Sequence, residues 1–379
     1  MDRIFSLEAF GALIGHLRSD GYQVLGPRVR EGAIVYGEVA GIDDLPAGWG
    51  DEQEAGRYRL VRRGDGRLFG FSVGPQSWKP MFFVPRARLV RLRRNRPGGD
   101  FEAEAPAPPP RLALVGARAC DLAALAVQDR TFLGGPFREP DYASRRQDVF
   151  VVAVNCGQAG GTCFCVSMGT GPRVTDAPMA AYDLALTELV DPHRFVVQSG
   201  SARGQALLDR LDARPASSAE TDEAAAICAR TAQSMGRALD TAGIKELLYR
   251  NQEHARWDDV AARCLGCANC TLACPTCFCS NVEDTSDLEG RVAERWRRWD
   301  SCFTLGHSYV HGGSVRVSTR SRYRQWLTHK LASWIDQFGT SGCVGCGRCI
   351  TWCPVGIDIT EEVAAIRAGE PSPPGGTSA

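Results

Sequence analysis

The sequence predicts an α+β fold, in which a mixed N-terminal α/β region precedes a smaller cysteine-rich domain. Its 379 residues suffice for two or three domains at roughly 100–200 residues each. Two apolar runs, 112–116 and 149–154, enclose a helix-like segment and lack polar alternation, which is the pattern of a parallel βαβ unit. Most of the 16 cysteines come later in the chain. These observations place a parallel sheet first and a cysteine-rich domain second.

The composition is that of an ordinary folded chain except for cysteine. Lys and Arg number 44, as do Asp and Glu, so no general electrostatic attraction draws the chain to nucleic acid or to an anionic membrane. No apolar run approaches the ~20 residues that span a bilayer, and the N-terminus lacks the charged-then-apolar pattern of a signal peptide. We therefore expect a cytoplasmic protein, in which cysteines more often hold metal or carry out redox chemistry than form disulfides.

Residues 1–96 are expected to form a small α+β unit. Apolar side chains at helical spacing predict a helix over 6–18, with Ser6 as its N-cap. Turn residues separate the short predicted strands 32–36, 58–61, 68–73 and 81–84. An arginine-rich stretch, 86–96, ends the unit. We interpret it as the solvated face of a strand rather than as a docking site for an acidic partner.

Three further segments follow this unit. The proline-rich and acidic residues 97–110 cannot bury a core and are predicted to be a linker or surface loop. Residues 111–254 form the α/β region with the βαβ unit, and 255–369 form the cysteine-rich domain. Helices are predicted at 121–130, 222–240, 243–254 and 321–338. The last residues, 370–379, are expected to be a disordered tail.

The cysteine-rich domain contains the same four-cysteine pattern twice. Each run has the spacing C-x2-C-x2-C-x3-C-P, ending at Pro275 and at Pro354. This is the bacterial pattern for 4Fe–4S clusters, in which tight turns let three thiolates surround one cubane. A structural zinc site usually has two C-x2-C pairs with a longer spacer. The pattern therefore predicts a bacterial-type two-cluster ferredoxin domain, with a long insertion of 68 residues between Cys274 and Cys343.

The fourth cysteine of each run is expected to serve the other cluster, because it lies on the following helical segment and points away. Cluster 1 is assigned to Cys264, Cys267, Cys270 and Cys353. Cluster 2 is assigned to Cys343, Cys346, Cys349 and Cys274. Arg263 and Arg348 each adjoin a ligand and would favour the more negative, reduced cluster.

Four further cysteines fall at the ligand-binding edge of the βαβ unit. Cys120 comes four residues after the first strand and Cys156 two residues after the second, so both belong at the carboxyl edge of the sheet. Cys163 and Cys165 follow in a glycine-rich loop that is flexible enough to close over a cofactor. We predict a third 4Fe–4S cluster on these four residues. Buried or free thiols, or a zinc site with the same ligands, are the alternatives.

Four cysteines remain. Cys228 lies in an alanine-rich helix and is expected to be a small buried hydrophobe. Cys277, Cys279 and Cys302 either pack beside the cluster pair or supply ligands for an extra cluster. The string Thr-Cys-Phe-Cys occurs twice, at 162–165 and 276–279.

No arrangement in the sequence indicates catalysis by the chain itself. Neither G-x-G-x-x-G after a strand nor G-x4-G-K-[ST] occurs, and we find no nucleophile–base arrangement. His307 and His311 are spaced as a metal pair, but without an acidic partner motif they are interpreted as structural. The chain is therefore predicted to move electrons between sites on other proteins.

Longer strings extend over nearly the whole chain. They are PQSWKP at 75–80, GARACDLAAL at 116–125, DRTFLGG at 129–135, NCGQAGGTCFCVSMGTGP at 155–172, CLGCANCTLACPTCFC at 264–279, WDSC at 299–302 and CVGCGRCITWCPVGIDI at 343–359. In these strings the chain resembles the beta subunit of cytosolic nickel–iron sulfhydrogenases, and the related A subunit of anaerobic sulfite reductase. The strings in the middle of the chain are much more specific than the cysteine runs.

The resemblance implies a non-catalytic electron-transfer subunit of an oxidoreductase complex. In a hydrogenase, its partners would be a flavin-binding, gamma-like subunit that handles NAD(P)H and a nickel–iron pair of small and large subunits. In the sulfite-reductase version, a flavin subunit and a sirohaem subunit take their place. The prediction is a relay in a cytosolic NAD(P)-linked hydrogenase. The alternative is the same relay in an anaerobic sulfite or sulfur reductase.

Overall fold

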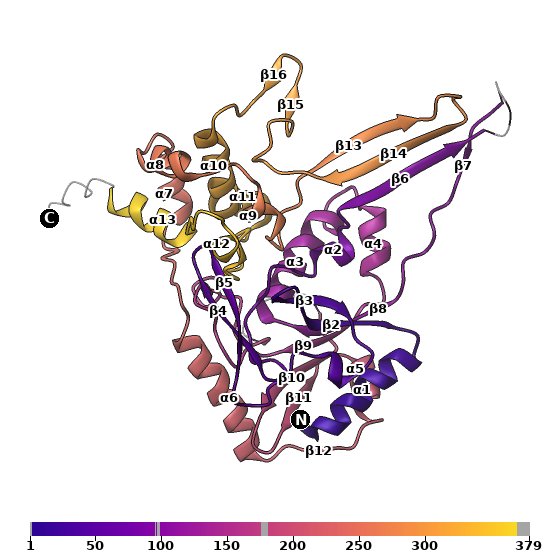
Figure 1. Ribbon diagram of the computed structural model, residues 1–379, viewed down its shortest axis with the longest axis vertical. Helices are drawn as coiled ribbons and strands as arrows, with labels where there is room; N and C mark the ends of the chain where they lie inside the picture. Colours follow the sequence, from indigo (N-terminus) through magenta and orange to yellow (C-terminus); the bar gives the residue numbers. More distant parts are fainter. Residues whose placement is uncertain (1, 95, 97–98, 176–180, 370–379) are drawn as a thin grey trace.

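The centre of the molecule is one mixed β-sheet (Figure 1). The structure is a computed structural model that describes residues 2–94, 96, 99–175 and 181–369. The strands of this sheet are β1 (Arg3–Ser6), β2 (Gln23–Arg30), β3 (Ala33–Glu38), β8 (Leu112–Ala117), β9 (Phe150–Val154), β10 (Leu184–Leu189), β11 (Arg194–Ser199) and β12 (Ala213–Pro215). Their order across the sheet is β12-β1-β11-β10-β9-β8-β2-β3. Strands β2, β8, β9 and β10 are mutually parallel, which gives the predicted mixed α+β architecture.

The predicted βαβ unit is confirmed as β8, α3 (Ala119–Leu133) and β9. Every residue of β8 and β9 is buried, as the uninterrupted apolar runs require. The other helices of this half of the chain are α1 (Leu7–Ser19), the one-turn η1 (Ile42–Asp44), α2 (Lys79–Phe82), α4 (Pro140–Arg146), α5 (Ala202–Leu208) and α6 (Ser218–Gln233). The predicted first helix is confirmed as α1, and the Ser6 hydroxyl accepts a hydrogen bond from the Ala9 N–H at 3.2 Å.

Two of the four predicted N-terminal strands are confirmed and two are wrong. β3 and β5 (Arg57–Arg62) are strands, and β5 pairs with the unpredicted β4 (Trp49–Glu54). Residues 68–73 are irregular, because their backbone bonds to buried side chains instead of to a neighbouring strand. The Glu188 carboxylate accepts from the N–H groups of residues 68 and 69, and the Arg118 guanidinium donates to the carbonyls of residues 69 and 71. Residues 81–84 contain the end of α2, which begins next to Pro80.

The first region and the α/β region share the main sheet. Strands β1–β3 precede the segment 97–110, and β8–β12 follow it, yet all belong to the same sheet. The arginine-rich stretch contains strand β6 (Arg86–Arg93), which pairs with β14 (Val292–Trp299) of the cysteine-rich region. Together with β7 (Glu102–Ala103) and β13 (Ser280–Ser286) these strands form the long arm at the upper right of Figure 1.

The cysteine-rich region is mainly helical and lies at one end of the sheet (Figure 1). Its elements are α7 (Ile244–Arg250), α8 (Arg256–Arg263), α9 (Asn269–Leu272), the small hairpin β15 (Tyr309–Val310) and β16 (Gly313–Ser314), α10 (Thr319–Thr328), the π-helical turn η2 (His329–Ser333), α11 (Trp334–Phe338), α12 (Arg348–Thr351) and α13 (Ile359–Ala368). The helix predicted at 321–338 is confirmed as the continuous α10, η2 and α11. The helices predicted at 222–240 and 243–254 are shorter, as α6 and α7, and the predicted tail 370–379 lies outside the described residues.

Candidate iron–sulfur centres

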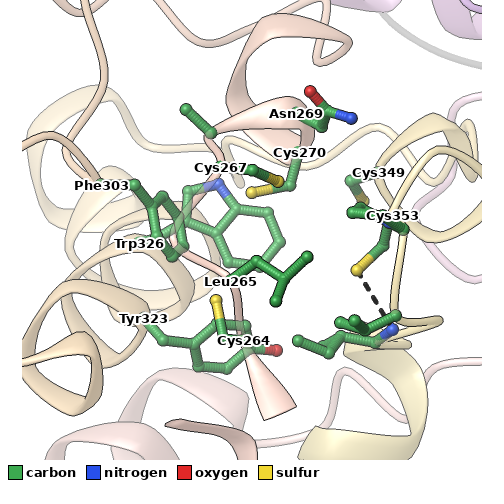
Figure 2. Close-up of a pocket in the computed structure, with 14 residues that line it drawn as sticks. Cys264, Leu265, Cys267, Asn269, Cys270, Phe303, Tyr323, Trp326, Cys349 and Cys353 are labelled. Atoms are coloured by element: carbon green, nitrogen blue, oxygen red, sulfur yellow. Dashed lines mark hydrogen bonds between the residues drawn. The ribbon is translucent and has the colours of Figure 1, made fainter.

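The first three cysteines of the first run surround a pocket together with the last two cysteines of the second run (Figure 2). Cys264 caps the C-terminus of helix α8, and its sulfur accepts a hydrogen bond from the Gly266 N–H at 3.4 Å. Cys267 and Cys270 follow around a tight turn. Cys353 faces the same pocket, and its sulfur accepts from the Ile357 N–H at 3.3 Å. The structure thus brings together the four residues assigned to cluster 1.

The insertion between the two runs supplies the wall of this pocket. Phe303, Tyr323 and Trp326 are buried aromatic side chains from the insertion, and they line the pocket (Figure 2). Five cysteines line it, the four assigned to cluster 1 and Cys349. The four thiols assigned to cluster 1 form a donor set that fits an iron–sulfur cluster, because thiolates are the usual ligands of such clusters and an apolar shell limits solvent access.

The second run forms the same kind of turn in a fully enclosed place. Gly345 and Gly347 have φ of 63° and 74°, and the Gly345 N–H donates to the Cys343 sulfur at 3.4 Å. Burial raises the pKa of the Cys343 thiol to about 12. Cys274 joins this group from the end of the first run: its electrostatic neighbours include Cys343, Cys346 and Cys349. These are the four residues assigned to cluster 2.

A buried lysine contacts this second group. Lys330 lies in the π-helical turn η2, and its ammonium donates to the Cys274 sulfur at 3.1 Å and to the Thr276 hydroxyl at 3.0 Å. Burial lowers the pKa of Lys330, but Cys274, Cys277 and Cys343 outweigh it, so the pKa is raised well above its ordinary value. Lys330 is therefore a cation directly beside a predicted cluster ligand.

The two arginines singled out in the sequence have carboxylate partners. The Arg348 guanidinium is 2.9 Å from Asp121, and Arg263 is 2.7 Å from Glu362. These carboxylates offset part of the positive charge that the arginines bring to the ligands. Sequence reasoning missed Lys330, which lies far from any cysteine in the chain. A second buried lysine, Lys79, was also missed although it belongs to the string PQSWKP.

The four cysteines predicted for a third cluster also converge. Cys120 lies in the first turn of α3, Cys156 follows β9, and Cys163 and Cys165 belong to the glycine-rich loop. All four line one pocket. Burial raises the pKa of all four thiols, that of Cys163 to about 12. The thiols are therefore protonated at neutral pH, and metal binding there must release protons.

The third pocket directly adjoins the second run. Gly345 and Cys346 line it beside Cys120 and Cys165. The Phe164 N–H donates to the Gly345 carbonyl at 2.8 Å, and the Thr162 hydroxyl lies 2.7 Å from that of Thr351. The glycine-rich loop is therefore fastened to the second run by both backbone and side chain.

The two copies of the string Thr-Cys-Phe-Cys, at 162–165 and 276–279, both contact the region of the second cysteine run. The copy at 162–165 contacts the second run, as just described. In the copy at 276–279, the buried Thr276 hydroxyl donates to the carbonyl of Gly342, the residue before the second run, at 2.6 Å. In both copies the threonine thus bonds within or next to the second run.

The remaining cysteines differ in their surroundings. Cys228 is buried in α6, as predicted. Hydrogen bonds from Cys302 and His307 lower the pKa of Cys279 to about 4. The thiol of Cys277 donates to Cys274, which lowers the pKa of Cys274. Nowhere in the described part of the chain do three or more His, Cys, Asp or Glu side chains lie as ligands of a single metal ion.

Comparisons with known proteins agree with this geometry and define the class of protein first. A family profile for the 4Fe–4S dicluster domain matches residues 263–357, which contain both runs and the insertion. This match supports two 4Fe–4S clusters.

The particular family follows from a longer match. The chain is 30% identical over 299 residues to sulfhydrogenase 2 subunit beta of Pyrococcus furiosus, and the match covers 77% of this chain and 83% of the relative. The chain belongs to the family of sulfhydrogenase beta subunits, as its motifs indicated. No solved structure matches it. Among the residues that the structure describes, no helix has the length and apolar character needed to cross a membrane.

Proposed function

We propose that the chain is the iron–sulfur subunit that relays electrons between a flavin subunit handling NAD(P)H and a nickel–iron hydrogenase pair. Its relative is by name a subunit of a sulfhydrogenase, which supports this complex over a sulfite reductase. The ligands proposed for clusters 1 and 2 are the crossed sets described above, and Cys120, Cys156, Cys163 and Cys165 are proposed to hold a third cluster. We further propose that the complex is cytoplasmic.

The observation that carries the relay is the position of the second run between two pockets. Cys349 lines the pocket of the first run, and Cys346 lines the pocket of the third site. Each bound cluster would accept and return one electron at a time. Ligands of the second cluster thus border both neighbours, so the protein offers a continuous route from one centre to the next.

The two ends of this route differ in their access to solvent, and both permit contact with a partner. Cys267 is exposed at the first pocket, and Leu265 beside it is 67% exposed. At the other end, Cys156 and Cys163 are half-buried, whereas Cys120 and Cys165 are buried. Electrons would enter at one end and leave at the other, and the enclosed second cluster would communicate only with its neighbours.

The relay is tested by removing a proposed ligand of the second cluster, which lies between the other two. In the purified complex, Cys346→Ser should leave NADPH reduction of the flavin intact and greatly slow hydrogen evolution from NADPH, because the second cluster is damaged. Cys228→Ser, in a helix outside the centres, should leave both rates unchanged. Undiminished hydrogen evolution in Cys346→Ser would contradict the proposal.

The same preparation distinguishes the two kinds of complex. Nickel in the co-purifying subunits is expected, whereas sirohaem would identify the sulfite-reducing alternative. We also propose that residues 255–369 act as the two-cluster domain, with 1–96 and 111–254 as the cluster-bearing scaffold on which it rests.

A further inference from the structure

Three cysteines outside the centres described so far gather with a histidine. Cys277 and Cys279 follow Thr276 in the second Thr-Cys-Phe-Cys string, and Cys302 follows strand β14. Cys302 and His307 both lie within hydrogen-bonding reach of the Cys279 sulfur. Cys277 lies equally close to Cys274, a ligand proposed for cluster 2. The four side chains come from two segments that are more than twenty residues apart in the sequence.

Two buried lysines flank this group, and neither pairs with a carboxylate among the described residues. Lys79 is 3% exposed, and its ammonium has only the carbonyls of Thr271 and Leu272 at 3.3 Å and the ring of Trp299 at 4.1 Å. The cysteines Cys277, Cys274 and Cys279 lie near it. Lys330, 4% exposed, contacts the same segment at Cys274 and Thr276.

A buried ammonium group is normally found next to an anion. An uncompensated buried charge costs several kcal/mol, so such groups are normally paired or hydrogen-bonded to charged partners. The negative charge of cluster 2 would compensate the ammonium of Lys330, which contacts the proposed ligand Cys274. Lys79 makes no hydrogen bond to a proposed cluster ligand among the described residues, and Cys277 and Cys279 are two of the three cysteines near it, which points to a further anionic centre beside it.

The repeated string supports the same conclusion. In the copy at 162–165, both cysteines line the third pocket, and the threonine and the backbone fasten the string to the second run. The copy at 276–279 is held at the start of the second run by the hydrogen bond from Thr276 to Gly342. Since the threonine of each copy bonds within or next to the second run, we expect the cysteines of the second copy to be ligands as well.

We propose that Cys277, Cys279, Cys302 and His307 bind a fourth iron–sulfur cluster. Thiolate and imidazole donors select iron–sulfur clusters, zinc or copper(I). A cluster is favoured over a single zinc or copper ion because Cys277 and Cys302 border ligands proposed for clusters 2 and 1, where a redox centre can exchange electrons with its neighbours.

His307 has the setting of a ligand rather than of a surface histidine. Its side chain is 18% exposed, and its Nδ1 lies 3.5 Å from a carboxylate oxygen of Asp300. The Nδ1 atom is buried and makes no hydrogen bond within the protein. A carboxylate beside the imidazole is the arrangement that orients histidine ligands of metals. The other nitrogen then remains available for iron.

The fourth centre would adjoin both clusters of the pair. Cys277 borders Cys274 of cluster 2, and Cys302 borders Cys270 of cluster 1. The proposal therefore adds a branch to the relay beside the cluster pair, while clusters 1 and 2 and their proposed function do not depend on it.

Iron analysis of the full chain, reconstituted without oxygen, tests the fourth centre. Cys279→Ala/Cys302→Ala should lower the iron content by about four atoms per chain and leave the electron paramagnetic resonance signals of clusters 1 and 2 in place. Cys228→Ala, another buried cysteine, serves as the matched control and should lose no iron. Unchanged iron in the double variant, or one zinc per chain bound at these residues, would overturn the proposal.

A second measurement does not depend on a destabilised variant. The reduced parent chain should show the strong nitrogen coupling of an iron-bound imidazole in pulsed electron paramagnetic resonance. His307→Cys should retain the iron and abolish that coupling, since a thiolate replaces the imidazole. Absence of the coupling in the parent, or its persistence in His307→Cys, would overturn the assignment of His307. Loss of the signals of clusters 1 and 2 would instead count against the proposed relay.

Discussion

The two cysteine runs have the same spacing and the same backbone turns but opposite surroundings. In the first run, Gly266 and Ala268 have φ of 63° and 66°; in the second, the corresponding Gly345 and Gly347 have φ of 63° and 74°. Cys267 is exposed, whereas its counterpart Cys346 is buried. The spacing therefore sets how a run can hold a cluster, and the rest of the fold sets whether that cluster faces solvent.

The packing explains why glycine occurs where it does. A Cβ on Gly266 would meet only Arg322 Nη1 at 3.9 Å, so the first run is open at this turn. In the second run, a Cβ on Gly345 would lie 2.6 Å from the Phe164 backbone, and one on Gly347 would lie 2.4 Å from the Thr162 carbonyl oxygen. The second run needs glycine for room as well as for its conformation.

The largest expected effect tests whether the runs exchange their fourth ligands. Cys353→Ser should damage cluster 1, because Cys353 lines the same pocket as Cys264, Cys267 and Cys270. Cys274→Ser should damage cluster 2 in the same way. Electron paramagnetic resonance of the two reduced variants identifies the cluster lost in each. Loss of the cluster belonging to the mutated run itself would refute the exchange.

The next largest effect is a difference in stability between substitutions at the turn residues of the two runs, Gly347 and Ala268. Gly347→Ala should destabilise the chain by about 2–5 kcal/mol, combining about 1–2 kcal/mol for a left-handed alanine with about 1–3 kcal/mol for overpacking against Thr162. The reciprocal change Ala268→Gly relieves the left-handed strain and should stabilise the first run by up to about 1 kcal/mol. Denaturant unfolding of the apo chain measures both. Equal and small effects would mean that the glycine-rich loop does not hold the second run.

A smaller effect is expected at the position after the first cysteine of each run. Val344 is 4% exposed, and Val344→Ser should destabilise the chain by about 1–3 kcal/mol, because it buries a hydroxyl in an apolar site. Leu265 is 67% exposed, and Leu265→Ser should change the stability by less than about 0.5 kcal/mol.

The same pair of variants separates stability from protection of the cluster. Leu265 lines the first pocket, so its removal should still speed the bleaching of cluster 1 in air. Thermal unfolding and the rate of absorbance loss distinguish the two effects. A strongly destabilised Leu265→Ser chain would contradict the open character of the first run.

The smallest expected effect is a shift in reduction potential. Lys330→Met removes the ammonium beside Cys274 and should lower the potential of cluster 2 by up to about 65–130 mV, since a charged hydrogen bond contributes about 1.5–3 kcal/mol and about 2.3 kcal/mol corresponds to about 100 mV for one electron. Cluster 1 should shift less. Lys245→Met, which removes a surface ion pair with Asp336, is the control and should shift neither. A redox titration in which the Lys330→Met and parent potentials coincide would refute this role.

The sequence predicted the parts of the molecule that depend on local pattern. The apolar runs predicted β8 and β9, and the cysteine spacing predicted the dicluster domain. It did not predict that residues 68–73 would be irregular, because their hydrogen-bond partners, Glu188 and Arg118, come from distant segments. Nor did it point to Lys330, whose position beside Cys274 depends on how the insertion folds back over the runs.

The central claim is that a third cluster adjoins the second and extends the relay. It is tested most directly by the iron content of the Cys279→Ala/Cys302→Ala chain, in which the fourth centre cannot form. Three clusters of four irons predict about twelve iron atoms per chain. A value near eight would mean that the pocket of Cys120, Cys156, Cys163 and Cys165 holds no cluster, and would contradict the account.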